Sequence, residues 1–299
     1  MRTLLFRAAF FYPRIYAFFA YYRKKERRRE FEEKVRLFFP EEWPSKKIKQ
    51  VVQGVIELRG VRKVMRYLIP HMDGRFIRSF VQAEGLEHLD LLLKERRGVL
   101  LIAGHIGIPH LSFNALRAMG YNVTLLSGVT PKIPKHPAYR YYDTDANTIF
   151  VHDPARSATY KRQILETLQS GGIIYYDGDA GEGKVKEMIP FLGKTLGFPT
   201  GMIHLAHRAN AAVVPFVHLY HRGKITLIVK EPIDRGWTET VEGYRRIMTE
   251  FADVLQSYVL QYPDQYLGIY GPTVLDLFYR SQKKGKIQTE QEAFSSGSA

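Results

Sequence analysis

From about residue 98 onward, short apolar runs alternate with helical stretches, and this alternation restricts the fold more than any other feature of the sequence. The runs have the length of strands, and the stretches between them carry apolar residues at helical spacing. The predicted strands are 98–104, 122–128, 148–151, 172–177, 211–220 and 224–230, and the predicted helices are 109–119, 156–169, 199–209 and 238–260. This order predicts an α/β fold with a mixed, mostly parallel sheet covered by helices, and its last two strands form a hairpin.

The chain divides into four parts by composition. Residues 30–97 have apolar side chains at three- and four-residue spacing, which predicts a helical lead-in to the sheet. The α/β core is predicted over 98–280, followed by a polar, flexible tail over 281–299. Residues 1–29 form an aromatic and basic segment of a different character.

That N-terminal segment contains TLLFRAAFFYPRIYAFFAYY (3–22), which continues directly into RKKERRR (23–29). Two arginines and Pro13 interrupt the apolar stretch, so it falls short of the roughly 20 apolar residues of a membrane span. A signal peptide fits poorly because no small-residue cleavage site follows. We interpret the segment as a peripheral or monotopic membrane-interface helix, with its basic cluster on the cytoplasmic face of the cell (inner) membrane. A buried helix followed by solvated charges is the alternative.

The charge balance agrees with the membrane interpretation. A formal net charge of +14 favours a polyanionic partner. The basic residues lie beside the aromatic segment and no nucleic-acid-binding module is recognised, so an anionic membrane surface is favoured over nucleic acid. The chain has no cysteine, which excludes disulfides, thiolate metal sites and a cysteine nucleophile.

A turn with two histidines follows the first predicted strand, in GVLLIAGHIGIPH (98–110). Functional groups of α/β sheets collect at the carboxyl ends of the strands, where His105 is placed. Gly107 permits a tight turn, and Pro109 fits the first position of a helix. His110 is therefore expected in the first helical turn, close to His105. An imidazole here is suited to act as a general base near neutral pH, although a lone histidine is more often structural.

A second strand end, in YYDGDAGEGKVKEMIPFLGK (175–194), carries acidic residues and a glycine-rich loop. Asp177 and Asp179 are expected at the same edge of the sheet as the histidine turn. The candidates for holding a phosphate are Lys184, Lys186 and Lys194, and those for an apolar lining are Phe191, Leu192 and Phe198. A flexible surface loop is the alternative. The loop lacks the P-loop spacing.

A metal site is the weakest interpretation of these groups. His105, His110 and Asp177 would make a set of two histidines and one carboxylate. Their spacing matches no zinc motif, so we predict no metal and no other cofactor.

Three blocks in fixed order, 83–126, 163–217 and YPDQYL (262–267), resemble the late lipid A acyltransferases. These are lauroyl and myristoyl transferases of the lysophospholipid acyltransferase superfamily. The resemblance spans roughly 35–267 and implies a membrane-bound acyltransferase. It implies transfer of a fatty acyl group from an acyl carrier protein or coenzyme A thioester, as co-substrate, to a hydroxyl of a lipid-like acceptor.

In that family a histidine deprotonates the acceptor hydroxyl, and an Asp or Glu five positions later orients the histidine. The resemblance assigns the base to His105, whereas the position of the acid holds His110. A neutral imidazole supplies no negative charge. Three outcomes remain open: another carboxylate, with Asp177 as the leading candidate, replaces the acid; the histidine pair works with weaker activation; or the scaffold has become a silent or repurposed lipid- or carrier-binding protein.

The resemblance also suggests which other residues line the site. Carried over block by block, the expected lining is Asp177, Asp179, Gly193, Gly201 and Arg208. A backbone amide of the histidine turn is expected to stabilise the tetrahedral oxyanion. The basic loop residues are expected to hold the phosphopantetheine of the donor or a phosphate of the acceptor.

Overall fold

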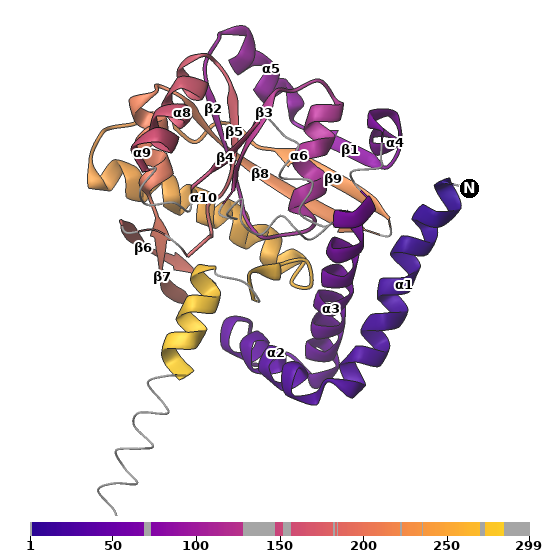
Figure 1. Cartoon of the computed structure of the whole chain (residues 1–299). Helices are drawn as coiled ribbons and strands as arrows, with labels where there is room; N and C mark the ends of the chain where they lie inside the picture. The colour runs from indigo at the N-terminus through magenta and orange to yellow at the C-terminus, as the bar shows by residue number, and fades with distance from the viewer. Residues whose placement is uncertain are drawn as a thin grey trace, which may run out of the picture.

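In the computed structural model of the protein, a seven-stranded sheet forms the centre of the molecule (Figure 1). The residues described are 2–68, 73–127, 147–151, 157–181, 183, 185–221, 223–234, 236–269 and 273–283, with the backbone alone for 2–10, 66, 67 and 110. The strands of this sheet are β1 (Val81–Glu84), β2 (Val99–Ala103), β3 (Val123–Ser127), β4 (Thr148–Phe150), β5 (Ile173–Asp177), β8 (Ala212–His221) and β9 (Lys224–Val229).

The strands lie in the order β1-β9-β8-β2-β5-β3-β4. β8 and β9 pair antiparallel as a hairpin, and every other pair in this sheet is parallel. β2, at the centre, is completely buried, as expected for a parallel strand covered on both faces. The predicted α/β class, with its mixed and mostly parallel sheet, is confirmed.

The helices that precede and cover the sheet follow the predicted pattern closely. They are α1 (Arg2–Arg23), α2 (Lys25–Phe38), α3 (Ser45–Leu68), α4 (Gly74–Arg78), α5 (Leu86–Lys94), α6 (Pro109–Ala118), α8 (Ser157–Gln169), α9 (Gly201–Arg208) and α10 (Val241–Gln261), with a 3-10 turn at Leu267–Ile269. The expected helical lead-in over 30–97 has one exception, because β1 lies within it and forms an edge of the sheet. Four residues are too few for periodicity to separate them from a helix.

A second difference is the hairpin of β6 (Lys186–Phe191) and β7 (Lys194–Pro199), which occupies part of the predicted loop. Leu192 and Gly193 both have positive φ, the combination of a two-residue hairpin turn whose twist matches the strands. Phe191, Leu192 and Phe198, the expected apolar lining, are buried in the core.

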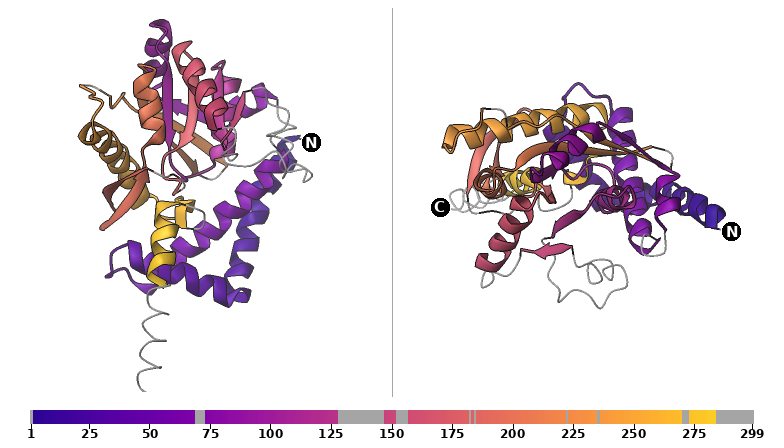
Figure 2. Two further views of the ribbon diagram at one scale, coloured as in Figure 1. Left: turned by 60° about the vertical axis from the view of Figure 1, so that its left-hand side comes forward. Right: turned by 90° about the horizontal axis from the view of Figure 1, so that it is seen from above.

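The first three helices form an arm beside the sheet, and α1 lies alongside α3 (Figures 1 and 2). α1 buries Pro13, Ala17, Ala20 and Tyr21 and exposes large apolar or aromatic side chains elsewhere. The exposed ones are Phe11, Tyr12, Ile15, Tyr16, Phe18, Phe19 and Tyr22. Within the described part of the chain, no helix is long and apolar enough to cross a membrane.

A buried ion pair fastens α2 to a C-terminal helix at 274–283. Lys34 Nζ lies 2.7 Å from Asp276 Oδ1 and donates a second hydrogen bond of 2.7 Å to the carbonyl oxygen of Ile269. A buried charge needs such partners because it has lost its water. The helix includes 281–283 of the expected polar tail, and residues 284–299 lie outside the described part.

Candidate functional site

Two neighbouring strands bring the histidine turn and the acidic turn together. β2 and β5 are parallel neighbours in which Ala103 is paired with Asp177. The pairing continues past the strand ends, because the amide of Gly178 donates a 2.7 Å hydrogen bond to the carbonyl oxygen of Ala103. His105 and Asp179 each follow their paired residue by two positions, so sheet register places them side by side at the carboxyl edge.

The Asp179 carboxylate contacts both the side chain and the backbone of His105. Asp179 Oδ1 lies 2.6 Å from His105 Nδ1, and Oδ2 accepts a 3.0 Å hydrogen bond from the amide of His105. Oδ2 also accepts a 2.8 Å hydrogen bond from the Tyr266 hydroxyl. Burial favours the neutral acid, but the His105 charge and the hydrogen bonds outweigh it and lower the pKa of Asp179. Asp179 is therefore an ionised carboxylate that fixes one tautomer of His105.

The other ring nitrogen of His105 points toward Asp177. His105 Nε2 lies 3.9 Å from Asp177 Oδ2, which is longer than a hydrogen bond. The His105 side chain is 21% exposed and that of Asp177 27% exposed, so solvent reaches part of both side chains. Burial opposes the imidazolium, but the charges of Asp179 and Asp177 and the hydrogen bond to Asp179 raise the pKa of His105 to about 9.

A short hydrogen-bonded chain supports Asp177 from within the sheet. The Tyr175 hydroxyl donates a 3.2 Å hydrogen bond to Asp177 Oδ1 and lies 3.0 Å from His218 Nε2. Because the single hydroxyl proton points to Asp177, His218 must donate from Nε2. Burial, followed by the positive charge of Arg62, lowers the pKa of His218 to about 3, which keeps this histidine neutral. Burial is also the main reason that the pKa of Asp177 is raised.

The segment 262–267, YPDQYL, fastens the histidine turn. Gly107 N donates to the Gln265 carbonyl oxygen (2.9 Å), and Leu267 N donates to the His105 carbonyl oxygen (2.8 Å). The Gln265 side chain exchanges two hydrogen bonds with the backbone of Tyr220. This segment therefore connects β8 to the histidine turn through hydrogen bonds and positions the Tyr266 hydroxyl next to Asp179.

Gly107 leaves no room for a side chain. Its φ is +61°, and a Cβ atom built there lies 2.1 Å from the carbonyl oxygen of His218. Gly107→Ala is therefore expected to lower the free energy of unfolding by about 2–4 kcal/mol. This loss combines the cost of a left-handed backbone conformation for alanine with the cost of the overlap between its Cβ atom and rigid backbone.

Gly193→Ala is the matched control for that substitution. Its φ is +70°, but a Cβ atom there meets nothing within 4 Å, so only the conformational penalty of about 1–2 kcal/mol applies. Urea denaturation of both variants gives the comparison. Equal losses of stability would contradict a special packing requirement at Gly107.

The backbone amides of residues 105–107 in the histidine turn all donate hydrogen bonds within the protein. The amide of His105 donates to Asp179, that of Ile106 to Gly104 and that of Gly107 to Gln265. The expectation that one of them serves as an oxyanion donor is wrong for residues 105–107. At the start of α6, Pro109 has no N–H, and the amides of Leu111 and Ser112 donate to the carbonyl oxygen of Ile108. The amide of His110 is therefore the alternative in this first turn.

The structure separates the other predicted site residues. Lys186 begins β6, while Gly193 and Lys194 lie at the far end of the hairpin, about 17 Å away at 3.3 Å per strand residue. Gly201 begins α9, and Arg208 is exposed at the last position of that helix. α9 runs back from the carboxyl edge to the amino ends of the strands, so Arg208 is not brought to His105.

Two of the predicted site residues lie wholly or partly outside the described part of the chain. Lys184 lies outside the described residues, as does the side chain of His110, whose backbone is in the first turn of α6. Over the described side chains, no three His, Asp or Glu residues are grouped closely enough to hold a metal ion.

Sequence reasoning missed Tyr266 and Arg62. Tyr266 follows the predicted strands by more than 30 residues and reaches Asp179 through its hydroxyl. Arg62, on α3, exerts its positive charge on both His105 and Asp177. The signal for Tyr266 is the YPDQYL block, which is part of the family resemblance but has no role assigned to it. Nothing in the sequence distinguishes Arg62 from the other basic residues of α3.

The chain matches one known protein family over most of its length. Residues 6–270 match the family model described as bacterial lipid A biosynthesis acyltransferase. No curated protein gives a significant match. A crystal structure of the 1-acyl-sn-glycerophosphate (LPA) acyltransferase PlsC from Thermotoga maritima is similar to the chain with a TM-score of 0.41 and 16% identity, covering 86% of this chain and 97% of that chain.

Proposed function

Because the chain belongs to the bacterial lipid A biosynthesis acyltransferase family, we propose that it moves a fatty acyl group from an acyl carrier protein or coenzyme A thioester to a hydroxyl of a lipid acceptor. Membership of this family supports the acyltransferase reaction and the lipid acceptor. The observation that carries the proposed mechanism is the 2.6 Å contact between His105 Nδ1 and Asp179 Oδ1.

In this mechanism His105 is the general base. With Nδ1–H donated to Asp179, neutral His105 presents a lone pair at Nε2, which accepts the proton of the acceptor hydroxyl. The hydroxyl oxygen attacks the thioester carbonyl carbon, and a tetrahedral oxyanion forms. Collapse breaks the C–S bond, and the leaving thiolate takes the proton from the imidazolium. No covalent acyl-enzyme is required.

Asp179 replaces the acid that the family places five residues after the base. Its negative charge stabilises the imidazolium while the tetrahedral species exists. Asp177, which we expected to take this role, lies on the Nε2 side and raises the basicity of the imidazole electrostatically. The oxyanion is held by the amide of His110 in the first turn of α6, where the helix dipole also favours negative charge.

The protein is proposed to work as a peripheral or monotopic enzyme on the cytoplasmic face of the cell membrane. The exposed aromatic face of α1 supports this placement, since amphipathic aromatic rings such as that of Tyr are enriched at the membrane interface. The basic run 23–29 follows directly and would meet anionic headgroups. The exposed Lys186 and the partly buried Lys194 remain proposed contacts for phosphate groups.

The test is a transfer assay resolved by pH, with acyl carrier protein and coenzyme A thioesters compared as donors and the product lipid measured by mass spectrometry. Only neutral His105 can act as the base. With a pKa of about 9, kcat/KM is therefore expected to rise about tenfold per pH unit through neutral pH and to level off near pH 9. Absence of transfer from either donor at every pH would contradict the proposal and favour a silent lipid- or carrier-binding scaffold.

A further inference from the structure

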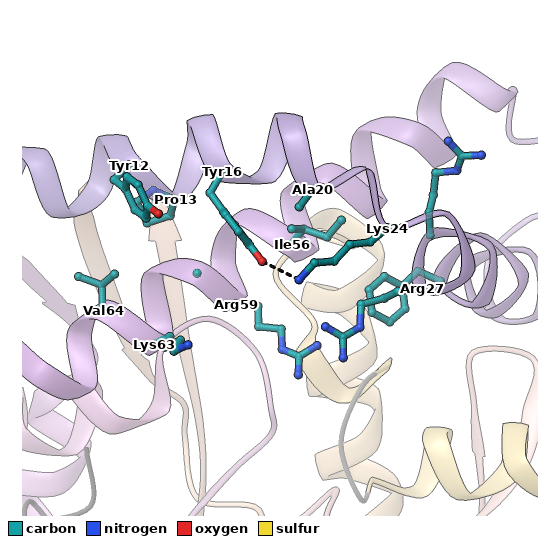
Figure 3. Close-up of a pocket in the computed structure, with 13 residues that line it drawn as sticks. Tyr12, Pro13, Tyr16, Ala20, Lys24, Arg27, Ile56, Arg59, Lys63 and Val64 are labelled. Carbon is teal, nitrogen blue, oxygen red and sulfur yellow. Dashed lines mark hydrogen bonds between the residues drawn. The ribbon is translucent and has the colours of Figure 1, made fainter. Parts of the chain in front are cut away.

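A cavity of about 450 Å³ lies between α1, α2 and α3, apart from the His105–Asp179 pair (Figure 3). Five cationic side chains line it: Lys24, Arg27, Arg28, Arg59 and Lys63. Arg27 and Arg59 point into the same space, with Lys24 above them. Its volume is in the range of small-molecule sites, which measure roughly 300–1,000 Å³.

The charge in this cavity is strongly one-sided. None of the described residues that line it is acidic, and Arg28 has an acidic neighbour, Glu32, at 3.6 Å. Lys24 donates a 2.9 Å hydrogen bond to the Tyr16 hydroxyl. That bond, followed by the positive charges of Lys24, Arg27 and Lys63, lowers the pKa of Tyr16 although burial opposes it. The cavity therefore stabilises negative charge.

The same cavity borders the exposed aromatic face of α1. Tyr12 and Tyr16 line it and also belong to that exposed face. Its wall is preformed, because α1 and α3 approach closely where a Cβ atom on Gly60 would lie 3.0 Å from Pro13 Cβ. A ligand with a negative head and an apolar body would meet cations inside and aromatic rings at the rim.

We propose that this cavity binds the phosphate headgroup of an anionic membrane phospholipid, with its acyl chains along the aromatic face of α1. The proposal deepens the membrane attachment of the proposed function and assigns the site to a bound lipid that is not a reactant. A concave cavity of this size suits one headgroup. An acidic carrier protein would require a broad, open surface instead.

The position of the cavity links lipid binding to the reaction. Arg59 and Lys63 are one helical turn apart on α3 and face the cavity. Arg62, on an adjacent face of the same helix, exerts its charge on His105 and Asp177. A headgroup held by α3 would therefore fix the catalytic edge next to the bilayer from which the acceptor comes.

The test compares two double variants of the full-length protein with the same change in charge on the same helix. Arg59→Gln/Lys63→Gln alters the cavity, and Lys46→Gln/Lys47→Gln alters exposed cations in the first turn of α3. Binding is measured by co-sedimentation with phosphatidylcholine vesicles that contain or lack phosphatidylglycerol. The cavity variant is expected to lose affinity for the anionic vesicles on the order of tenfold, and the control distinctly less. Equal losses, or no loss, would overturn the proposal.

A second measurement separates the headgroup from phosphate alone and from carrier-protein binding. Short-chain phosphatidylglycerol below its micelle concentration is expected to raise the Tm of the wild type but not that of the cavity variant. An equal rise with inorganic phosphate, or loss of carrier-protein binding with vesicle binding intact, would overturn the lipid assignment. Because neither readout requires turnover, failure of the acyl-transfer assay leaves this result interpretable on its own.

Discussion

His105→Ala is expected to lower kcat for acyl transfer by about 10²- to 10⁴-fold, the range that a positioned general base contributes. The Nε2 atom of His105 is the nitrogen left accessible once Nδ1 is held by Asp179. Without it, the acceptor hydroxyl must lose its proton to water while it attacks the thioester. Single-turnover assays with saturating donor measure this loss directly.

His88→Ala on α5 is the control for removing an imidazole elsewhere in the chain. It is expected to retain wild-type kcat, and thermal unfolding should show that both variants keep the fold. Wild-type turnover in His105→Ala would refute the assignment of the base.

Asp179→Asn is expected to have an effect of similar size, up to about 10⁴-fold in kcat, as for the aspartate of a catalytic triad. The amide keeps the shape of the carboxylate but removes the charge that stabilises the imidazolium. It also favours the wrong tautomer of His105, because an amide NH₂ can donate to Nδ1. Tyr266→Phe, which removes one hydrogen bond to Asp179 and retains its charge, is expected to cost much less.

Asp177→Asn distinguishes the role of Asp177 from that of Asp179. Asp177 raises the pKa of His105 but does not hydrogen-bond to it, so this variant should retain transfer and shift the rising limb of the pH profile to lower pH. His110→Ala should likewise lose less activity than Asp179→Asn if Asp179 supplies the acid. A loss confined to Asp177→Asn or His110→Ala would assign the acid to that residue instead.

Much of the fold was predictable because its signals are local. The strands before and after the histidine turn are apolar runs of strand length, and the helices between them have helical spacing. The β6–β7 hairpin was missed because its turn residues, Leu192 and Gly193, lie in a stretch rich in glycine and lysine. Because glycines occur throughout that stretch, the sequence did not single out Leu192 and Gly193 as the pair with positive φ.

The candidate site was predictable in part. His105 and the two aspartates were expected at one edge, since parallel neighbours present their carboxyl ends together. Their order of importance was not predicted. Asp177 is the last residue of β5, whereas Asp179 lies in the turn beyond it and alone reaches Nδ1.

The sequence by itself determined the alternation of strands and helices, the histidine at a strand end and the absence of cysteine chemistry, because each depends on residues close together in the chain. Only the tertiary structure decided which carboxylate partners His105. That choice depends on the register of β2 with β5 and on Tyr266, which is 87 residues from Asp179. The direction of a side chain in a turn is set by such distant contacts, and no local pattern encodes them.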